Sequence, residues 1–448
     1  MIGVLFRKSE SAFIGRRFVP APGNRNIPFF ESNVLGGASV VNGCVHAVGD
    51  RELWRDFLGR FKIEFKDILE GFRDLYTLDV SAPGKIPLKL APRTKLDLHI
   101  SKSLSLEMHL NSGDTNFSDS ASFGAIYNTV ARRHRSSVLN LIHGRSFSIL
   151  LGHEALDLAF SPKGRLVGVV TNSGLLKADF VVLSAGVIGS NSFLLRQRDG
   201  HAGRNLPTFE RVGKGVGDHL NLRVNVLTKG SFGSLNEVSE DPIKKILLYL
   251  RHWIGIPSLM STTGATTSIQ LDLDGDGRVD TKINILHFSE EGRHGSSGKY
   301  FHERPGFSLS ITPIMPMSRG SICLDDGDLS VDPGYLSEKS DVTLLKTALQ
   351  WCMTLLTSPS MKPLIDSIVE EELILSDPFQ YIFKNVFSGH HLIGGAHDLI
   401  DHNFQCYDIP GLFICDASIM DRHLSSNIHA PVVLLSDQFA KRLIKIGD

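Results

Sequence analysis

The sequence predicts a mixed fold, α/β or α+β overall, in which a strand-rich middle is inserted between two glycine-rich ends. Three observations predict this class. Runs of β-branched and apolar residues, separated by turn signals, recur through most of residues 140–326. A long helical pattern follows at 341–358, and the chain closes with one more apolar run and a helical pattern at 430–446. A chain of 448 residues has room for about two or three domains.

The first part of the chain has few regular patterns. Residues 1–35 are rich in Arg, Pro and Asn and show no clear periodicity. Asp67–Tyr76 has the apolar spacing of a short amphipathic helix. Residues 77–115 mix short alternating runs with Pro and Gly, as loops and small strands do. After Asn140 the sequence turns strand-like, beginning with SFSILLGHEALDLAFS at 146–161.

The strand patterns resume at Leu222–Thr228 and continue to the long helix expected at Asp341–Ser358. Asp341 is placed to cap this helix. The apolar residues of the helix form one stripe, at Val342, Leu345, Leu349, Cys352, Met353 and Leu356.

Charge and composition exclude several classes of protein. Lys and Arg number 47 against 48 Asp and Glu, so no basic excess exists to neutralise nucleic-acid phosphates. No apolar run reaches the ~18 residues of a transmembrane helix, and the apolar patch in MIGVLFRKSE is too short for a signal peptide. We therefore expect a cytoplasmic protein with reduced thiols in packed positions. Its five cysteines match neither a disulfide framework nor a zinc pattern, at Cys44, Cys323, Cys352, Cys406 and Cys415.

Two glycine-containing stretches have the character of ligand-binding loops. NVLGGASVVNG, at Asn33–Gly43, combines adjacent glycines with small residues and suits close approach of the backbone to a ligand. In VVLSAGVIGS, at Val181–Ser190, an apolar strand runs into Ser-Ala-Gly, which can turn backbone amides toward a ligand at the carboxyl end of the strand. The alternative for the second stretch is a core strand with a tight turn.

The C-terminal part contains two further candidates. In GLFICDASIM, at Gly411–Met420, an apolar strand ends in Asp416, and a buried carboxylate is costly unless something binds it. Sugar-like hydroxyls of a dinucleotide are one partner, and a helix N-cap contact is the alternative. In SSNIHAPVVLL, at Ser425–Leu435, Pro431 fits the first turn of the closing helix. The free amides of that turn form an anion site that could stabilise a negatively charged ring system.

The stretch SGHHLIGGAHD, at Ser388–Asp398, places paired histidines before Gly-Gly. Histidine is the usual general base near neutral pH, so a catalytic histidine is one interpretation. Surface or core histidines are the second. A metal site is the third, but the spacing matches no zinc pattern, and we expect no metal. The residues that the metal interpretation would use are His390, His391, His397, Asp398 and His402.

Six motifs, in this order, resemble those of the glucose-methanol-choline (GMC) oxidoreductases, a family that holds FAD. The resemblance covers roughly residue 30 to the C-terminus. The Gly-Gly after HLI is more similar to the cholesterol-oxidase branch than to the alcohol-oxidase branches, which usually carry Gly-Thr. The motifs are NVLGGASVVNG, VVLSAGVIGS, VGKGVGDHL (Val212–Leu220), VDPGYLSEKSD (Val331–Asp341), HLIGG (His391–Gly395) and DASIM…SSNIHAP (Asp416–Pro431).

The resemblance implies a Rossmann-like FAD-binding domain with an inserted antiparallel-sheet domain for substrate. The FAD domain would take residues 1–225 and 386–448, the latter with the catalytic residues, and the substrate domain would take residues 226–385. The implied activity is oxidation of a small-molecule alcohol to a carbonyl by hydride transfer to flavin. The protein positions and polarises the substrate while the flavin carries the difficult chemistry.

The resemblance also implies the site residues. His391 would be the base, and Asn427, 427 − 391 = 36 residues later, would be its partner. Val41 stands where some relatives attach FAD covalently through histidine, so we expect noncovalent FAD. The residues that would bind the cofactor are Gly36, Gly37, Ser39, Asn42, Gly43, Ala185, Gly186, Asp416, Ala417 and His429.

One part of the family pattern has no counterpart in the sequence. The chain contains no GxGxxG, and GKGVGD at Gly213–Asp218 has its glycines at the wrong spacing. Residues 1–32 show no strand–glycine–helix unit. We expect a FAD-binding domain that lacks its first βαβ unit. Three explanations stay open: a truncated or mis-started product, a module supplied by a separate chain, and a non-catalytic relative that no longer binds FAD by itself.

The stretch DLDGDGRVD indicates a second class of function, calcium binding. It matches the first nine positions of a calcium loop, but Ile283 stands at the twelfth position and no helices flank the loop. The alternating residues on both sides predict a β-hairpin with an acidic tip. A solvated turn and a structural calcium site stay open, and the ligands would be Asp272, Asp274, Asp276 and Asp280.

Overall fold

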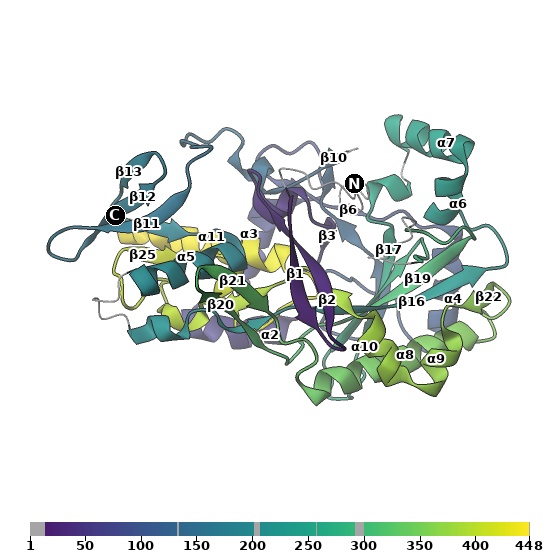
Figure 1. Ribbon diagram of the computed structural model, residues 1–448. Helices are drawn as coiled ribbons and strands as arrows, with labels where there is room; N and C mark the ends of the chain where they lie inside the picture. Colours follow the sequence, from purple (N-terminus) through teal and green to yellow (C-terminus); the bar gives the residue numbers. More distant parts are fainter. Residues whose placement is uncertain (1–13, 132–133, 201–206, 257, 292–299, 448) are drawn as a thin grey trace.

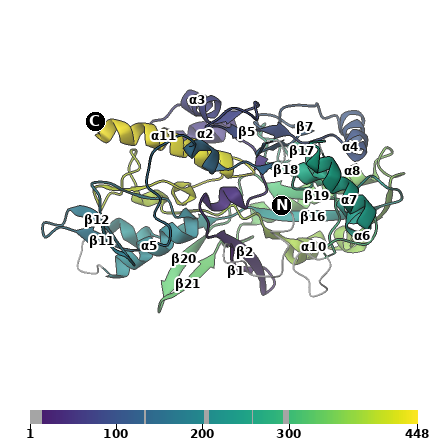
Figure 2. The same cartoon turned by 90° about the horizontal axis from the view of Figure 1, so that it is seen from above.

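The computed structural model describes residues 14–131, 134–200, 207–256, 258–291 and 300–447. A large antiparallel sheet and its helices form one part of the molecule (right in Figure 1). The C-terminal helix and a smaller group of strands form the other part (left), and a long hairpin crosses between the two. Seen from above, the two parts lie side by side along one axis (Figure 2). The mixed α/β class with an antiparallel-sheet domain is confirmed.

The antiparallel sheet has seven strands and two different faces. On one face, Ile269, Ile283 and Ile311 lie in one cross-strand row and are fully buried. Helix α8 (Lys339–Thr357) packs on the strands from the apolar side. The other face carries polar residues in every strand. The strands, in spatial order, are β22 (Ile365–Ile368), β16 (Leu220–Thr228), β19 (Gly306–Pro313), β18 (Thr281–Leu286), β17 (Ala265–Leu271) and β7 (Ser122–Ala125), and β23 (Phe387–Ser388) pairs with β16.

The predicted helix at Asp341–Ser358 is present as α8, but its cap was predicted wrongly. The helix begins two residues earlier and Glu338 occupies the N-cap position. Asp341 lies buried in the first turn, where its carboxylate accepts hydrogen bonds from the backbone amides of Met317 and Ser318, both at 2.8 Å. The carboxylate therefore fixes the incoming chain instead of capping the helix. The short helix predicted at Asp67–Tyr76 is also present, as α3 (Phe65–Leu75).

The second part contains a parallel strand pair formed by segments far apart in the sequence. Strand β14 (Val181–Leu183) pairs with β25 (Leu412–Ile414), and α5 (Gly186–Gly200) follows β14 directly. The closing helix α11 (His429–Gly447) packs against α3. It begins at His429, so Pro431 lies in its first turn, as predicted. An antiparallel meander borders this part, made of β11 (Ala155–Phe160), β12 (Leu166–Thr171) and β13 (Gly174–Lys177).

Two segments differ from their sequence patterns. The aperiodic N-terminal region forms an antiparallel hairpin, β1 (Ile14–Ala21) and β2 (Arg25–Ser32), whose turn places Gly23 and Asn24 at positive φ. In the strand-like run at 146–161, only β11 is a strand, and the residues before it are irregular. The apolar side chains of that earlier stretch are exposed, so no partner strand stabilises it.

A four-stranded sheet joins the two parts. Its spatial order is β21 (Asp328–Asp332), β20 (Gly320–Asp325), β15 (Lys214–Gly217) and β24 (Ile393–Gly395). The predicted domain boundaries remain predictions, although β7 shows that the large sheet also uses residues before 226. The remaining helices are α2 (Arg51–Leu58), α4 (Lys95–Leu106), α6 (Leu235–Glu240), α7 (Pro242–Trp253), α9 (Glu371–Ser376) and α10 (Pro378–Asn385). The short strands are β3 (Val45–His46), β4 (Tyr76–Thr77), β5 (Ile86–Pro87), β6 (Lys89–Leu90), β8 (Tyr127–Asn128), β9 (Val130–Ala131) and β10 (His134–Arg135).

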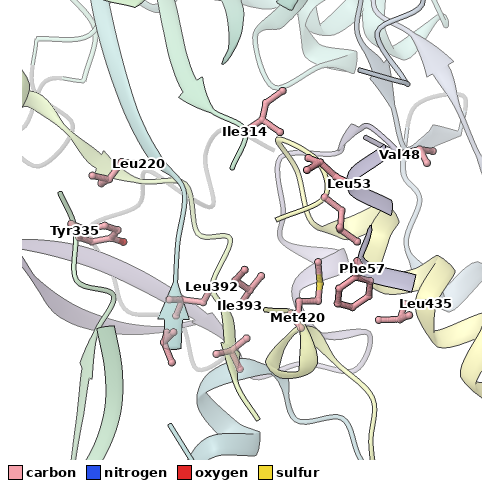
Figure 3. Packing of buried hydrophobic residues seen from close by; sticks show 14 of the residues in the cluster. Val48, Leu53, Phe57, Leu220, Ile314, Tyr335, Leu392, Ile393, Met420 and Leu435 are labelled. Carbon is pink, nitrogen blue, oxygen red and sulfur yellow. The ribbon is translucent and has the colours of Figure 1, made fainter. Parts of the chain in front are cut away.

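One hydrophobic core continues beneath both parts. Figure 3 shows Leu392 and Ile393 beside each other, with Met420 from another segment nearby and Ile314 farther off, toward Leu53. All four side chains are buried. Strand β24 is therefore held by apolar packing immediately after the paired histidines. This packing places the histidine segment on a rigid support.

Candidate active site

A buried carboxylate holds the histidine segment in place. Asp218, just after β15, accepts hydrogen bonds from the backbone amide of His391 at 2.6 Å and from the hydroxyls of Ser388 at 2.6 Å and Tyr335 at 2.5 Å. Burial raises the pKa of Asp218 to about 6, against the opposing effect of these donors. The bonds from Ser388 and His391 fix the histidine segment to Asp218, and the bond from Tyr335 holds the same carboxylate from another segment.

A row of hydrogen bonds runs through the rings of two histidines. His219 Nε2 lies 2.8 Å from the carbonyl oxygen of Ile314, and its Nδ1 lies 2.9 Å from Nδ1 of His391. His391 Nε2 in turn lies 3.3 Å from the amide nitrogen of Asn427. The sequence-predicted pair is therefore brought together, and His219 lies directly behind it.

A third histidine supports the same cluster. His423 stacks on His219 with ring centroids 3.8 Å apart, and its Nε2 lies 2.9 Å from the carbonyl oxygen of His391. Burial is the main cause that lowers the pKa of all three rings, and repulsion from neighbouring histidines adds to it at His391 and His423. The pKa of His219 falls to about 4, and those of His391 and His423 fall well below 6.5. The three imidazoles are therefore neutral at pH 7.

The neutral state determines which ring nitrogens carry protons. A carbonyl oxygen only accepts, so His219 carries its proton on Nε2 and its Nδ1 is an acceptor. His391 must then donate from Nδ1 to His219, which leaves His391 Nε2 without a proton. Asn427 donates its amide to this nitrogen. The fold thus presents an unprotonated imidazole nitrogen beside a side-chain amide, as a base for an alcohol requires.

The neighbouring histidine is placed differently. His390 has φ of 60° and its ring lies against Phe29 and Phe30 of β2, at centroid distances of 5.1 and 5.3 Å. The N-terminal hairpin therefore packs on His390, while His391 faces Asn427. His397 lies elsewhere, next to Arg60 and Asp398. The geometry therefore favours His391 over His390 as the candidate base.

The predicted glycine loop is linked to the start of the closing helix through Arg135. Gly36 and Gly37 both have positive φ, and Ser39 bonds back to the Gly36 carbonyl at 2.7 Å, which closes a short 3-10 turn over Gly37–Val40. Asn42 accepts a hydrogen bond from Arg135 at 2.5 Å. The charge of Arg135 also contributes, after burial, to lowering the pKa of His429 to about 4. Arg135 therefore lies between the loop and the first residue of α11.

His429 has a feature that suits a bound ring system. Both of its ring nitrogens are buried and, among the described residues, have no hydrogen-bond partner. Nε2 of His46, whose pKa is lowered by burial and by the nearby His429, is likewise buried without a partner. Buried polar atoms in proteins are nearly always satisfied. The unsatisfied nitrogens at the start of α11 therefore fit the polar edge of a flavin.

Asp416 makes the contacts of a helix N-cap, which was the alternative to binding sugar hydroxyls. Its carboxylate accepts from the backbone amides of Gly186 at 3.0 Å and Ser418 at 2.8 Å, and from the hydroxyl of Ser190 at 2.5 Å. Ala185 bonds to the same serine, and Ala417 begins the 3-10 turn that Asp416 caps. These bonds join the ends of β14 and β25. Contact of Asp416 with sugar hydroxyls remains a prediction.

The acidic tip forms the predicted hairpin turn between β17 and β18. Carboxylate oxygens of Asp272, Asp274 and Asp276 lie within 4.8 Å of one another. Asp280 is directed elsewhere, because its carboxylate accepts from the backbone amides of Leu273 and Asp274. The solvated turn and the calcium site both stay open for this loop.

Several site residues were not assigned from the sequence. Asp218 and His219 lie in the recognised motif VGKGVGDHL, so that motif was their signal. Tyr335 lies in VDPGYLSEKSD in the same way. His423 had no signal of its own, because only the fold brings it to the cluster. Most of the thiols are packed as expected, since Cys44, Cys352, Cys406 and Cys415 are buried, whereas Cys323 is exposed.

Comparison with known proteins shows what the chain resembles as a whole. Residues 316–436, which contain the histidine segment, match the family model described as GMC oxidoreductase. The chain is 24% identical over 469 residues to oxygen-dependent choline dehydrogenase of Stenotrophomonas maltophilia (strain R551-3), covering 94% of this chain and 82% of that protein. The fold is similar to that of a formate oxidase, with a TM-score of 0.83, 14% identity and coverage of 99% and 90%. It is also similar to pyridoxine 4-oxidase from Mesorbium loti, with a TM-score of 0.76, 18% identity and coverage of 96% and 88%.

The relatives that match this chain in sequence and in fold are named as oxidases and dehydrogenases. More specifically, the chain is similar to GMC oxidoreductases in sequence and in fold. The matches give no support to a separate chain that supplies a nucleotide-binding module. In the part of the chain that the structure describes, no helix has both the length and the apolar character needed to cross a membrane.

Proposed function

We propose that this protein oxidises an alcohol to a carbonyl compound with FAD as its cofactor and His391 as the general base. Its similarity to GMC oxidoreductases supports FAD dependence and action on CH–OH donors. The observation that carries the assignment of the base is the hydrogen-bond chain from Ile314 through His219 to His391. This chain leaves Nε2 of His391 unprotonated and directed toward Asn427.

Each residue of the site has a distinct task. His391 Nε2 takes the proton of the substrate hydroxyl, and the amide of Asn427 anchors the substrate oxygen. His219 keeps the other ring nitrogen protonated, and Asp218 holds the backbone. When bound, FAD supplies the hydride acceptor. His429, Arg135 and the loop at Gly36–Gly43 would hold its ring, and Val41, which has no nucleophilic atom, supports noncovalent binding.

The test begins with an absorbance spectrum of the purified chain before and after added FAD. Flavin bands that survive desalting would allow anaerobic reduction by a panel of alcohols. His391→Ala should then lower the rate of flavin reduction by about 10²- to 10⁴-fold and leave the flavin bound. The matched control is His390→Asn, which tolerates positive φ and should retain the wild-type rate. Undiminished reduction in His391→Ala would refute the assignment.

One observation favours the second candidate, a relative that no longer retains FAD by itself. Among the described strands, β14 pairs only with β25, so its other edge is open. Phe180 and Val182 are 41% and 39% exposed, which is high for an apolar strand in a parallel pair. A spectrum without flavin bands, even after FAD is added, would establish this candidate. The cytoplasmic location also remains part of the proposal.

A further inference from the structure

The large sheet has a second face that is polar and nevertheless buried. We call it the polar face. The strand registers place its residues in two cross-strand rows on the side opposite the Ile269–Ile283–Ile311 row. Seven of the nine side chains are buried, and Asn221 and Asn284 are partly buried. The rows are Ser122–Gln270–Lys282–Thr312–Asn221 and Ser268–Asn284–Ser310–Arg223.

Some polar groups on this face have no partner in the protein. Ser268 Oγ and Asn284 Oδ1 are buried without a hydrogen bond among the described residues. Lys282 is 2% exposed, and no described group forms a hydrogen bond or ion pair with its ammonium. Gln270, in contrast, donates to the Thr115 carbonyl and the Ser118 hydroxyl. A buried lysine without a counterion is costly, so its retention points to a partner that is not part of the chain.

One row of the polar face leads toward the segment that contains His391. This row passes from Lys282 to Thr312 and then to Asn221, whose carbonyl oxygen accepts from the Thr312 hydroxyl at 2.5 Å. Asn221 also pairs with Phe387, four residues before His391. The charge of Lys282 adds to the effect of burial in lowering the pKa of His46, His219 and His391. Lys282 is therefore within electrostatic reach of the proposed base.

We infer that the polar face is the substrate-binding wall of the active site, and that the substrate is a small alcohol bearing a carboxylate that binds the ammonium of Lys282. The inference rests on the proposed function and names its substrate class. The hydroxyls and amides around Lys282 would complete the hydrogen bonds of the carboxylate. The alcohol end of the same molecule would lie toward His391 and Asn427.

A carboxylate fits this wall better than a neutral group does. The acidic residue near the second row, Glu290, is already paired with Arg223. Lys282 is thus left with a charge that no described acid compensates. Burial lowers the pKa of Lys282 to about 8, so the ammonium still carries its charge at pH 7. A charge-assisted hydrogen bond to an ionised carboxylate is stronger than one to a hydroxyl.

The first test compares two four-carbon substrates, 4-hydroxybutanoate and 1,4-butanediol, in anaerobic flavin reduction. Lys282→Met, which keeps the length of the side chain, should lower kcat/KM for 4-hydroxybutanoate on the order of 100-fold, mainly through KM. The same variant should lower kcat/KM for 1,4-butanediol far less, because the diol has no carboxylate for Lys282 to bind. Lys163→Met, at an exposed lysine on the β11–β12 turn, is the matched control. Equal losses for the two substrates would overturn the inference.

The second test does not need turnover. Butanoate, which has no hydroxyl to oxidise, is titrated calorimetrically into the wild-type protein, Lys282→Met and Lys163→Met, with 1-butanol as the neutral probe. Binding of butanoate that Lys282→Met alone abolishes supports the polar face as a carboxylate site, even if no alcohol reduces the flavin. That combination would refute the proposed function and leave the anion site standing. Absence of butanoate binding to the wild-type protein would overturn the site.

Discussion

Replacing His219 by leucine should slow flavin reduction by about 10- to 100-fold while FAD stays bound. In the wild-type protein His219 accepts the Nδ1 proton of His391, and leucine removes that acceptor. A buried donor without a partner costs about 1–3 kcal/mol, and each ~1.4 kcal/mol changes a population about tenfold. The His391 proton would therefore move to Nε2, the nitrogen that must be free to act as a base.

The assay for this prediction measures both rate and tautomer. Stopped-flow flavin reduction at saturating alcohol gives the rate, and ¹⁵N chemical shifts of the histidine rings report which nitrogen carries the proton. The control is His219→Gln, whose amide can accept from His391 and donate to the Ile314 carbonyl, and which should retain most of the rate. The reasoning fails if the leucine variant keeps the wild-type rate, or if the glutamine and leucine variants lose it equally.

The other predictions concern stability. The free energy of unfolding should fall as the pH drops below about 6.5, because His46 and His219 take up protons only in the unfolded chain; burial lowers their folded-state pKa to about 3 and about 4. Asp218 offsets part of this loss below its raised pKa, but it is one group against two histidines. A urea midpoint that does not fall between about pH 7 and pH 5 would therefore contradict the histidine argument. Gly49→Ala should destabilise the protein by several kcal/mol, because Gly49 has φ of 106° and a Cβ would lie 1.9 Å from the Leu424 carbonyl oxygen. Gly59→Ala, at a helical glycine with open space around it, is the control for thermal unfolding.

The parts of the fold that were predictable are those with a strong local signal. Helix α8 carries its apolar stripe in one continuous segment, so its extent was evident within two residues. The pairing of His391 with Asn427 came from ordered motifs. The N-terminal hairpin had no such signal, because its strands are stabilised by contacts such as that of Arg17 with the Leu329 carbonyl, far along the chain. Local pattern cannot report such contacts.

The polar face shows a second limit of sequence reasoning. In β18 the residues alternate as Thr281, Lys282, Ile283 and Asn284, the pattern of a strand with one face in water. The structure buries Lys282 as fully as Ile283. Alternation shows which residues share a face, but it does not show what covers that face. The cover comes from distant segments, such as those of His46 and His391.

The hydrogen bond between Asp218 and the His391 amide also sets the order in which the site is completed during synthesis. Asp218 and the His391 amide that it binds are 173 residues apart in the chain. At ribosomal speeds of about 5–20 residues per second, Asp218 waits about 10–35 s for this donor. During that interval its carboxylate and the ammonium of Lys282 remain hydrated, and the sheet can form around a wet interior. The His391–Asn427 pair is complete only when Asn427 has been made, so a shorter nascent chain lacks the full site.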